Sequence, residues 1–303
     1  MPRHTRRDFL KAGAATAVCG TTLLSSKSLF ASPWDLPLGL QLYSVRDLLP
    51  KDYEGTLKQV AAIGYREVEA AGFYGHSAAD VKQAMASADL HCVSAHYPSA
   101  ELNRDLDKII AFHKELGADY IVCSSPGHKD PSAPARTPGG GPPHAISMDD
   151  WHWNAEQFNQ FGEKVKAAGL KFGYHNHVAE FAKQGDVVPY DDLLRLTDPA
   201  LVTFEMDCGW VTVGGGDPVS YLHRFPDRIS MLHVKDFKRS ATSTPSAPPA
   251  AAELGRGTTD FGAIFKATKQ GQIKHYFVEQ EAFDIPPFEA LKIDADYMTK
   301  LTI

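Results

Sequence analysis

The sequence predicts an α/β protein folded as a single (β/α)8 barrel, the TIM-barrel architecture. Eight short apolar runs alternate along the chain with segments of helical periodicity. A short motif recurs at residues 62–65, 115–118 and 167–170. In each copy an amphipathic helix ends at a glycine, and the next apolar run follows. Repeated strand–helix units form parallel sheets, and eight of them suit a closed barrel.

The eight runs have the length and composition of buried strands. They lie at residues 39–43, 67–69, 92–96, 120–123, 171–175, 202–206, 229–233 and 276–279. The helix after the first run places Leu57, Val60 and Ala61 on one face, and Gly64 follows it as a helix-ending glycine. A doubly wound open sheet is the alternative, but no glycine-rich dinucleotide turn follows the first run.

Two segments interrupt this alternation. Residues 124–143 are rich in Pro and Gly, and residues 240–252 are rich in Ser, Thr, Pro and Ala. Neither composition can supply a core, so we expect long loops or partly disordered segments. Each follows a strand and therefore belongs to the carboxyl-terminal face of a barrel, where substrates bind. A lid at this face and an inert insertion both stay open as their role.

The amino-terminal residues match a twin-arginine export signal. Residues 5–11, with Arg6 and Arg7, precede a weakly apolar run at 12–24, and cleavage after Ala31 would leave residues 32–303 as one barrel domain. We therefore expect a periplasmic protein. Removing five basic residues and one acidic residue would change the net charge from −6 to −10, which disfavours nucleic acid and anionic membranes as partners. No later segment predicts a membrane span.

Three cysteines follow the leader, and they lie in or beside apolar runs. Cys92, Cys123 and Cys208 have no C-x-x-C spacing. We expect small buried side chains and neither a disulfide framework nor a zinc site made of thiolates.

Ionisable side chains close six of the eight runs. They are Glu69, His96, His175, Asp207, His233 and Glu279. Because every strand of a parallel barrel ends at the same mouth, these side chains are expected to ring one opening. Uncompensated charge in such a place is costly. Mixed carboxylate and imidazole ligands suit Mn²⁺, Co²⁺, Zn²⁺ or Fe²⁺ better than Mg²⁺, so we expect a divalent-metal site.

The fifth run leads into two imidazoles. Strand alternation puts His175 and His177 on one face and Asn176 on the other. One imidazole would bind the metal while the other meets the substrate; alternatively, one of them hydrogen-bonds Glu180.

Two further residues near the strand ends have two interpretations each. Glu205 shares a face with Asp207, and we expect a buried partner lower in the barrel rather than a ligand. Lys235 either stabilises an enolate at a substrate oxygen or pairs with Asp236 at the rim.

These residues together resemble the xylose isomerase-like TIM barrels of the sugar phosphate isomerase/epimerase group, which includes tagatose 3-epimerase-like and inosose dehydratase-like enzymes. The resemblance extends from Leu38 to the last helix. Its best motifs lie at residues 64–69, 94–96, 207–210, 233–236, 255–257 and 278–279.

The resemblance implies a metal set of Glu, Asp, His and Glu from the last four strands. Asp207, His233 and Glu279 match the last three positions, whereas His175 stands where the epimerases carry a glutamate. In those relatives the two outer glutamates exchange the substrate proton. The histidine at position 175 argues against a symmetric mechanism with two glutamates. Glu279 would then be one base, and the second proton would come from His177, Glu180, His96 or Lys235.

We therefore expect an exported, divalent-metal-dependent isomerase or epimerase that removes a proton next to the carbonyl of a sugar or keto-sugar. A metal-dependent lyase or dehydratase of a keto-sugar or glycoside and a non-catalytic carbohydrate-binding barrel are the alternatives. The expected catalytic residues are Glu279, His177 and Lys235, and the expected ligands are His175, Asp207, His233 and Glu279. Expected substrate contacts are Glu69, His96, Asn176, Glu180 and Trp210. The small-molecule sugar, the metal and the homo-oligomeric state stay open.

Overall fold

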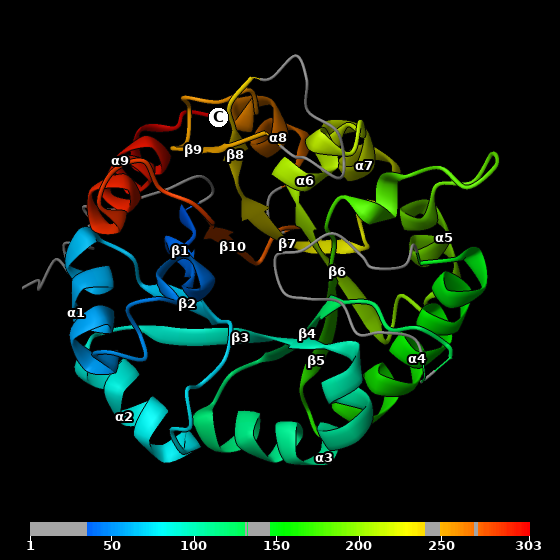
Figure 1. Cartoon of the computed structure of the whole chain (residues 1–303), viewed down its shortest axis with the longest axis horizontal. Coiled ribbons are helices and arrows are strands. Elements are labelled where there is room, and N and C mark those ends of the chain that lie inside the picture. The colour runs from blue at the N-terminus through cyan, green and yellow to red at the C-terminus, as the bar shows by residue number, and fades with distance from the viewer. Residues whose placement is uncertain (1–34, 131, 133–145, 240–248, 270–271) are drawn as a thin grey trace, which may run out of the picture.

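Eight parallel strands form a closed barrel (Figure 1). The structure is a computed structural model that describes residues 35–130, 132, 146–239, 249–269 and 272–303. The strands follow the order β1-β10-β7-β6-β5-β4-β3-β2. Their bounds are β1 (Gly39–Gln41), β2 (Glu67–Ala70), β3 (His91–Pro98), β4 (Tyr120–Ser125), β5 (Lys171–His175), β6 (Val202–Asp207), β7 (Ile229–Val234) and β10 (His275–Val278). The predicted barrel is confirmed, and each predicted run overlaps one of these strands.

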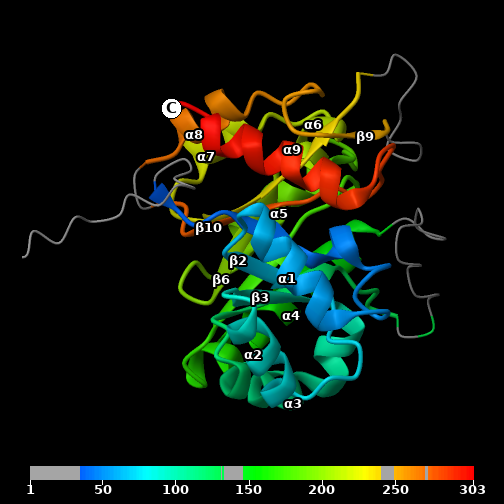
Figure 2. The same cartoon turned by 90° about the vertical axis from the view of Figure 1, so that its left-hand side faces the viewer.

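Helices surround the barrel as an outer ring (Figure 1). Their bounds are α1 (Tyr53–Ile63), α2 (Ala78–Ser87), α3 (Ser99–Leu116), α4 (Met148–Ala167), α5 (Pro189–Leu196), α6 (Cys208–Val213), α7 (Pro218–Arg224), α8 (Phe261–Ala267) and α9 (Pro287–Lys300). The first and last of them, α1 and α9, lie side by side in Figure 2. The ring therefore closes beside the pairing of β1 with β10.

Local sequence signals explain where the helices start and stop. Ser77 before α2 and Ser147 before α4 each form a capping box with the aspartate three residues later. The recurring glycines Gly64, Gly117 and Gly169 follow α1, α3 and α4 with φ of 125°, 88° and 84°. Side chains with a Cβ rarely adopt this conformation, so a glycine ends each helix at low cost.

The structure describes only parts of the two segments that were expected to form long loops. Residues 133–145 and 240–248 lie outside the described residues. Ala251–Ala252 forms β9, which pairs antiparallel with β8 (Asp236–Phe237) beside the barrel. Ala252 is buried. The expectation that residues 240–252 contribute no regular structure is therefore wrong for Ala251 and Ala252, whose small side chains can be buried in a short strand pair.

The lower interior of the barrel is apolar. Val93, Tyr120, Val122, Met231 and Phe277 form a separate cluster of buried side chains there. Strand side chains alternate, so residues two positions apart point the same way. His233 follows Met231 and Glu279 follows Phe277 at this spacing, so the polar side chains form a layer directly above the apolar cluster. The three predicted buried cysteines, Cys92, Cys123 and Cys208, are free and buried.

The described residues bear on the prediction about membrane spans but not on the prediction of an export signal. Across the described stretches, none of the helices combines the length and apolarity that a bilayer crossing requires. The predicted export signal, residues 1–31, lies outside the described residues.

Candidate metal centre

Side chains at the carboxyl-terminal ends of β5, β6, β7 and β10 meet in one place. His175, Asp207, His233 and Glu279 each offer a ligand atom, and these atoms all lie within 4.8 Å of one another. We call these four residues the outer quartet. All four side chains are buried. The outer quartet consists of the residues that the sequence predicts as metal ligands, so the strands bring together a set that spans more than a hundred residues.

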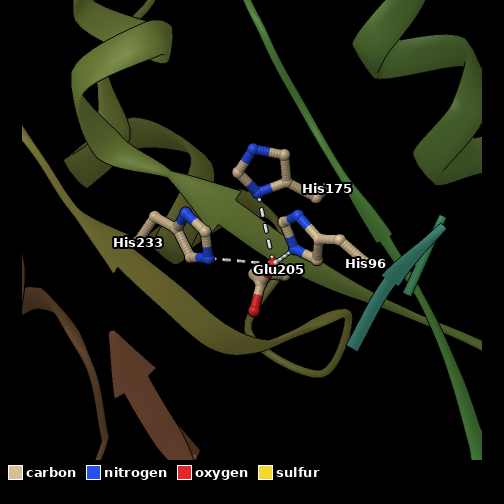
Figure 3. Close-up of side chains that lie close together, drawn as sticks. All are labelled: His96, His175, Glu205 and His233. Carbon is tan, nitrogen blue, oxygen red and sulfur yellow. Dashed lines mark hydrogen bonds and ion pairs between the residues drawn. The ribbon is translucent and has the colours of Figure 1, made fainter. Parts of the chain in front are cut away.

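A second group shares two of these side chains. His96, His175, Glu205 and His233 also offer ligand atoms that lie within 4.8 Å of one another (Figure 3). We call them the deep quartet, because Glu205 precedes Asp207 by two residues on the same inward face of β6. The predicted inward orientation of Glu205 is confirmed, since its side chain is fully buried among the imidazoles.

Glu69 also contacts two imidazoles of the deep quartet, at the nitrogen atoms that face Glu205. Its Oε1 atom lies 2.7 Å from His96 Nε2 and 2.8 Å from His233 Nε2. Gln41 Nε2 donates to the same oxygen at 2.7 Å, and Ser94 Oγ donates to Oε2 at 2.5 Å. Glu69 is therefore a structural anchor in this arrangement, held by residues of β1 and β3. Gln41 and Ser94 do not stand out in the sequence, because neither is an ionisable strand-end residue.

The three central imidazoles differ in charge. Burial opposes protonation of all three, but Glu69 and Glu205 raise the pKa of His96 to about 9. Against the same burial, Glu205, Glu279 and Glu69 raise the pKa of His233 well above its usual value. For His175, burial and the positive fields of His233 and His96 lower the pKa well below its usual value. His175 is thus neutral, which is the form of imidazole that binds a metal.

The carboxylates respond to the same fields. Burial raises the pKa of Asp207 to about 6, although Lys235 opposes this shift. Despite burial, His233 and His96 lower the pKa of Glu205 to about 2. Lys235 and His233 overcome burial at Glu279 and lower its pKa well below its usual value. Negative charge is therefore retained in the centre of the barrel.

The residues present fit a divalent cation. Four buried carboxylates, those of Glu69, Glu205, Asp207 and Glu279, surround the imidazoles of His96, His175 and His233, and Lys235 pairs with two of them. Oδ2 of Asp207, Oε1 of Glu205 and Nδ1 of His175 have no hydrogen-bond partner among the described residues. These atoms lack hydrogen bonds although their carboxylates belong to ion pairs, and a bound metal would stabilise this buried charge further. Two imidazoles and two carboxylates of the outer quartet suit Zn²⁺, Fe²⁺, Co²⁺ or Mn²⁺.

Lys235 has partners that differ from the predicted one. Its Nζ atom lies 2.6 Å from Glu279 Oε2, 2.5 Å from Glu281 Oε1 and 3.4 Å from Asp207 Oδ2. Asp236, the rim partner in one of the two interpretations of Lys235, instead accepts hydrogen bonds from the backbone amides of residues 237, 255, 257, 258 and 259. The pairing with Asp236 is wrong, because loop amides bond the Asp236 carboxylate and other carboxylates hold Lys235.

His177 and Trp210 lie together at the edge of the outer quartet. The His177 ring centroid lies 4.8 Å from that of His175 and 6.1 Å from that of Trp210. His177 is half-buried, so it is more accessible than the quartet below it. The Trp210 ring lies 5.0 Å from Lys235 Nζ, and the Trp210 amide donates to Asp207 Oδ1 at 2.8 Å. Trp210 thus orients one expected ligand and packs against the lysine.

Two of the expected substrate contacts face elsewhere. Asn176 is buried and exchanges hydrogen bonds with the Asp207 backbone, at 3.1 and 3.4 Å. Glu180 is also buried and accepts a hydrogen bond of 2.6 Å from Tyr174, whose ring stacks on Phe158 of α4 outside the barrel. Both residues brace the end of β5. The structure does not bring them to the mouth with His177.

The sequence of this chain is similar to those of a dehydratase and of an isomerase/epimerase. An inosose dehydratase from Clostridium beijerinckii is 24% identical over 257 residues, which cover 78% of this chain and 85% of that protein. A solved structure of a sugar phosphate isomerase/epimerase from Parabacteroides distasonis is 29% identical, covers 87% of this chain and 97% of that chain, and superposes with a TM-score of 0.70.

The fold also recurs at lower identity. The solved structure of an IOLI protein with a bound zinc atom is 12% identical, covers 88% of this chain and 99% of that chain, and has a TM-score of 0.66. The family model described as "Xylose isomerase-like TIM barrel" matches residues 57–301. The chain therefore belongs to the xylose isomerase-like TIM barrel family.

Proposed function

We propose that this protein is a divalent-metal-dependent lyase that eliminates water or an alcohol from a keto-sugar or a keto-glycoside. The proposal depends on one observation: the proton-carrying groups around the outer quartet are chemically unlike each other. Glu279 is a carboxylate, whereas His175 occupies the position where a second carboxylate is expected. A symmetric exchange between two glutamates is therefore not available, but an elimination needs one base and one acid.

A divalent ion bound by His175, Asp207, His233 and Glu279 would supply Lewis-acid polarisation of the substrate carbonyl. The chain itself must then move two protons. Glu279 is ionised, because Lys235 and His233 lower its pKa, and it can accept the proton from the carbon next to the carbonyl. Lys235 lies close enough to Glu279 to keep this carboxylate in one orientation.

The second proton has four candidate carriers, and their placement separates them. Glu180 is bonded to Tyr174, His96 lies in the deep quartet, and Lys235 is held by Glu279 and Glu281. His177 is half-buried at the edge of the outer quartet.

We therefore assign His177 as the general acid. The C–H electron pair moves toward the carbonyl as Glu279 takes the proton. The C–O bond at the next carbon then breaks as the carbonyl re-forms, and the leaving oxygen takes a proton from the His177 imidazolium. The products are an unsaturated ketone and water or an alcohol.

Names of relatives favour this reaction class without deciding it. The matching curated relative named above is an inosose dehydratase, and a dehydratase is a lyase. The solved relative is named as a sugar phosphate isomerase/epimerase. Isomerisation or epimerisation shares the first proton transfer and is the second candidate, with the proton returned to carbon by an imidazole rather than a second glutamate.

The test is turnover of keto-sugars in D₂O by metal-loaded protein, followed by mass spectrometry and by absorbance of the conjugated product. Elimination predicts an unsaturated product that lacks one water or alcohol. Epimerisation predicts a product of unchanged composition that carries one deuterium. Absence of bound metal and of any exchange would refute both and favour a carbohydrate-binding barrel.

Variants assign the roles of the two proton carriers. We expect Glu279→Gln to abolish exchange at the carbon next to the carbonyl. His177→Asn should keep that exchange and slow elimination by about 10²–10⁴-fold. His152→Asn is the matched control, because His152 is an exposed imidazole on α4 that pairs with Asp192. Equal loss of exchange and elimination in His177→Asn would contradict the assigned role.

We also propose that the protein is exported by the twin-arginine route. The support is the Arg6-Arg7 pattern and the apolar run that follows it. A fusion of residues 1–31 to a reporter that is active only after export should reach the periplasm, and replacing both arginines by lysine should retain it in the cytoplasm. Export that is indifferent to the arginines would refute the route.

A further inference from the structure

Three imidazoles point at one oxygen atom in the interior of the barrel (Figure 3). Oε2 of Glu205 lies 2.8 Å from His96 Nε2, 3.2 Å from His175 Nδ1 and 3.2 Å from His233 Nε2. The side chains come from β3, β5, β6 and β7, so the barrel itself holds them in place. This convergence lies below the outer quartet and is not needed for the proton transfers described above.

Two atoms in the deep quartet have unused binding capacity. Nδ1 of His175 is close to Glu205 Oε2 but forms no hydrogen bond among the described residues, and neither does the buried Oε1 of Glu205. The His175 side chain is 2% exposed and that of Glu205 is 0% exposed. Polar atoms this deeply buried are normally satisfied, so their state needs a physical reason. An ion between them would provide it.

Glu69 adds a further carboxylate oxygen on the ligand side of the deep quartet. Glu69 Oε1 contacts both His96 and His233, while Gln41 and Ser94 hold the two oxygens of Glu69. Because Glu69 Oε1 lies beside the same Nε2 atoms of His96 and His233 that face Glu205 Oε2, it adds negative charge at the point where a cation would bind. The apolar floor of Val93, Val122 and Phe277 keeps the space beneath them closed.

We propose that the deep quartet is a second metal-binding position, in which His96, His175, Glu205 and His233 bind a zinc-like ion. Three imidazoles and one carboxylate are a donor set that suits Zn²⁺ or Co²⁺. The outer quartet has two imidazoles and two carboxylates, and the larger share of carboxylate oxygen suits Mn²⁺ better. The two positions therefore prefer different ions.

The two positions compete for two shared imidazoles. His233 faces the deep quartet with Nε2 and the outer quartet with Nδ1, which lies 3.0 Å from Glu279 Oε2. Simultaneous occupation would require both nitrogens of one imidazole to be deprotonated. His175 is also common to both groups. One ion per chain is therefore expected, and its position depends on the metal supplied. The inference concerns binding alone and holds whether or not the proposed elimination is correct.

The test is metal binding to the full-length protein, freed of metal with a chelator and titrated separately with Zn²⁺ and Mn²⁺ in a calorimeter. Two variants remove deep ligands, His96→Asn and Glu205→Gln, and Asp207→Asn removes an outer ligand. The deep variants should lower Zn²⁺ affinity by at least about tenfold and leave Mn²⁺ affinity nearly unchanged. Asp207→Asn should do the reverse. Co²⁺ bound to the wild-type protein should show the intense visible bands of a tetrahedral site, and His96→Asn should abolish them.

Clear outcomes would overturn the proposal. Zn²⁺ affinity that is unchanged in both deep variants would refute it, and so would equal loss of Zn²⁺ and Mn²⁺ binding in Asp207→Asn. His152→Asn again controls for the loss of one imidazole. Circular dichroism of the metal-free variants shows which of them fold. If Glu205→Gln fails to fold, His96→Asn decides the result, because the His96 side chain is 12% exposed and lies at a strand end.

Discussion

Nζ of Lys235 lies 2.6 Å from Oε2 of Glu279, and the lysine side chain is 1% exposed. Glu281 contacts the same ammonium at 2.5 Å, and burial fails to neutralise it because Glu279, Glu281 and Asp207 together raise its pKa far above the usual value. These carboxylates favour the charged form of the lysine over the neutral form that a base would need. Its role is to hold Glu279 ionised and in position.

Replacing Lys235 by methionine should destabilise the metal-free protein. The substitution leaves Glu279 and Asp207 buried without their cation, and breaking a buried ion pair from one side costs about 3–5 kcal/mol. Urea unfolding of metal-free Lys235→Met measures the loss, and Lys238→Met is the control because Lys238 is an exposed lysine paired with Asp284. A Lys235→Met protein as stable as the control would show that the carboxylates are compensated in another way.

Metal should partly rescue that variant and should stabilise the wild-type protein. An ion that binds only the folded chain stabilises it by about 2.7 kcal/mol at a hundred times its dissociation constant. We expect the melting temperature to fall by several degrees when a chelator removes the ion. Scanning calorimetry with and without excess Zn²⁺ measures this shift. A melting temperature that is the same in both conditions would contradict a metal centre built from these carboxylates.

The carboxylate of Asp236 organises the loop that follows β9. It is 1% exposed and accepts hydrogen bonds from the amides of Phe237, Gly255, Gly257, Thr258 and Thr259. Charge-assisted bonds of this kind are about twice as strong as neutral ones. Asp236→Asn places an amide group where donors converge, so we expect a loss of about 1–3 kcal/mol and local opening of the loop.

Hydrogen exchange measures that opening directly. Residues 254–259 should exchange faster in Asp236→Asn than in the wild-type protein, and Asp227→Asn, at an exposed aspartate, should leave them unchanged. Gly257→Ala provides an independent variant, because a Cβ there would lie 2.1 Å from Asp236 Oδ1. Unaltered exchange in both variants would show that other contacts hold the loop.

The sequence predicts the barrel well because each strand–helix unit carries its own local signals. Apolar runs, helix-ending glycines and the capping serines specify the units, and closure of eight of them follows from geometry. Strand-end reasoning places six ionisable side chains at one mouth, and the family resemblance selects the outer quartet from among them. Once His175, Asp207, His233 and Glu279 are assigned to strand ends, the fold brings them together without any information on their contacts.

The rest of the centre depends on three-dimensional detail. Glu281 reaches Lys235 because of the path of the chain after β10, and Gln41 and Ser94 reach Glu69 through the register of β1, β2 and β3. Such register is not visible in a single sequence. The pairing of Lys235 with Asp236 fails because the amides of the loop after β9 bond the Asp236 carboxylate, and this loop contact is not visible in the sequence.

Asp294 of α9 provides a pH-dependent test that is independent of the metal centre. Its Oδ1 atom accepts a hydrogen bond of 2.7 Å from the Leu254 amide, and Oδ2 has no hydrogen-bond partner within the described residues. Burial raises the pKa of Asp294 from 3.8 to about 7, and the negative charges of Glu253 and Asp236 add to this shift. A raised carboxyl pKa means that the unfolded chain ionises first, so Asp294 lowers stability as pH increases from about 4 to 7.

Asp294→Asn removes this titration. The unfolding free energy of the variant relative to the wild-type protein should rise by up to about 1.4 kcal/mol per pH unit between pH 4 and 7 and level off above it. A new unpaired amide can lower the variant's stability by a constant amount, so the slope with pH and not the absolute difference is the readout. Urea unfolding at several pH values measures it, with Asp296→Asn, an exposed aspartate paired with Lys292, as the control. A flat difference between variant and wild-type protein across this range would show that Asp294 is ionised in the folded chain throughout, with a cation or water satisfying Oδ2.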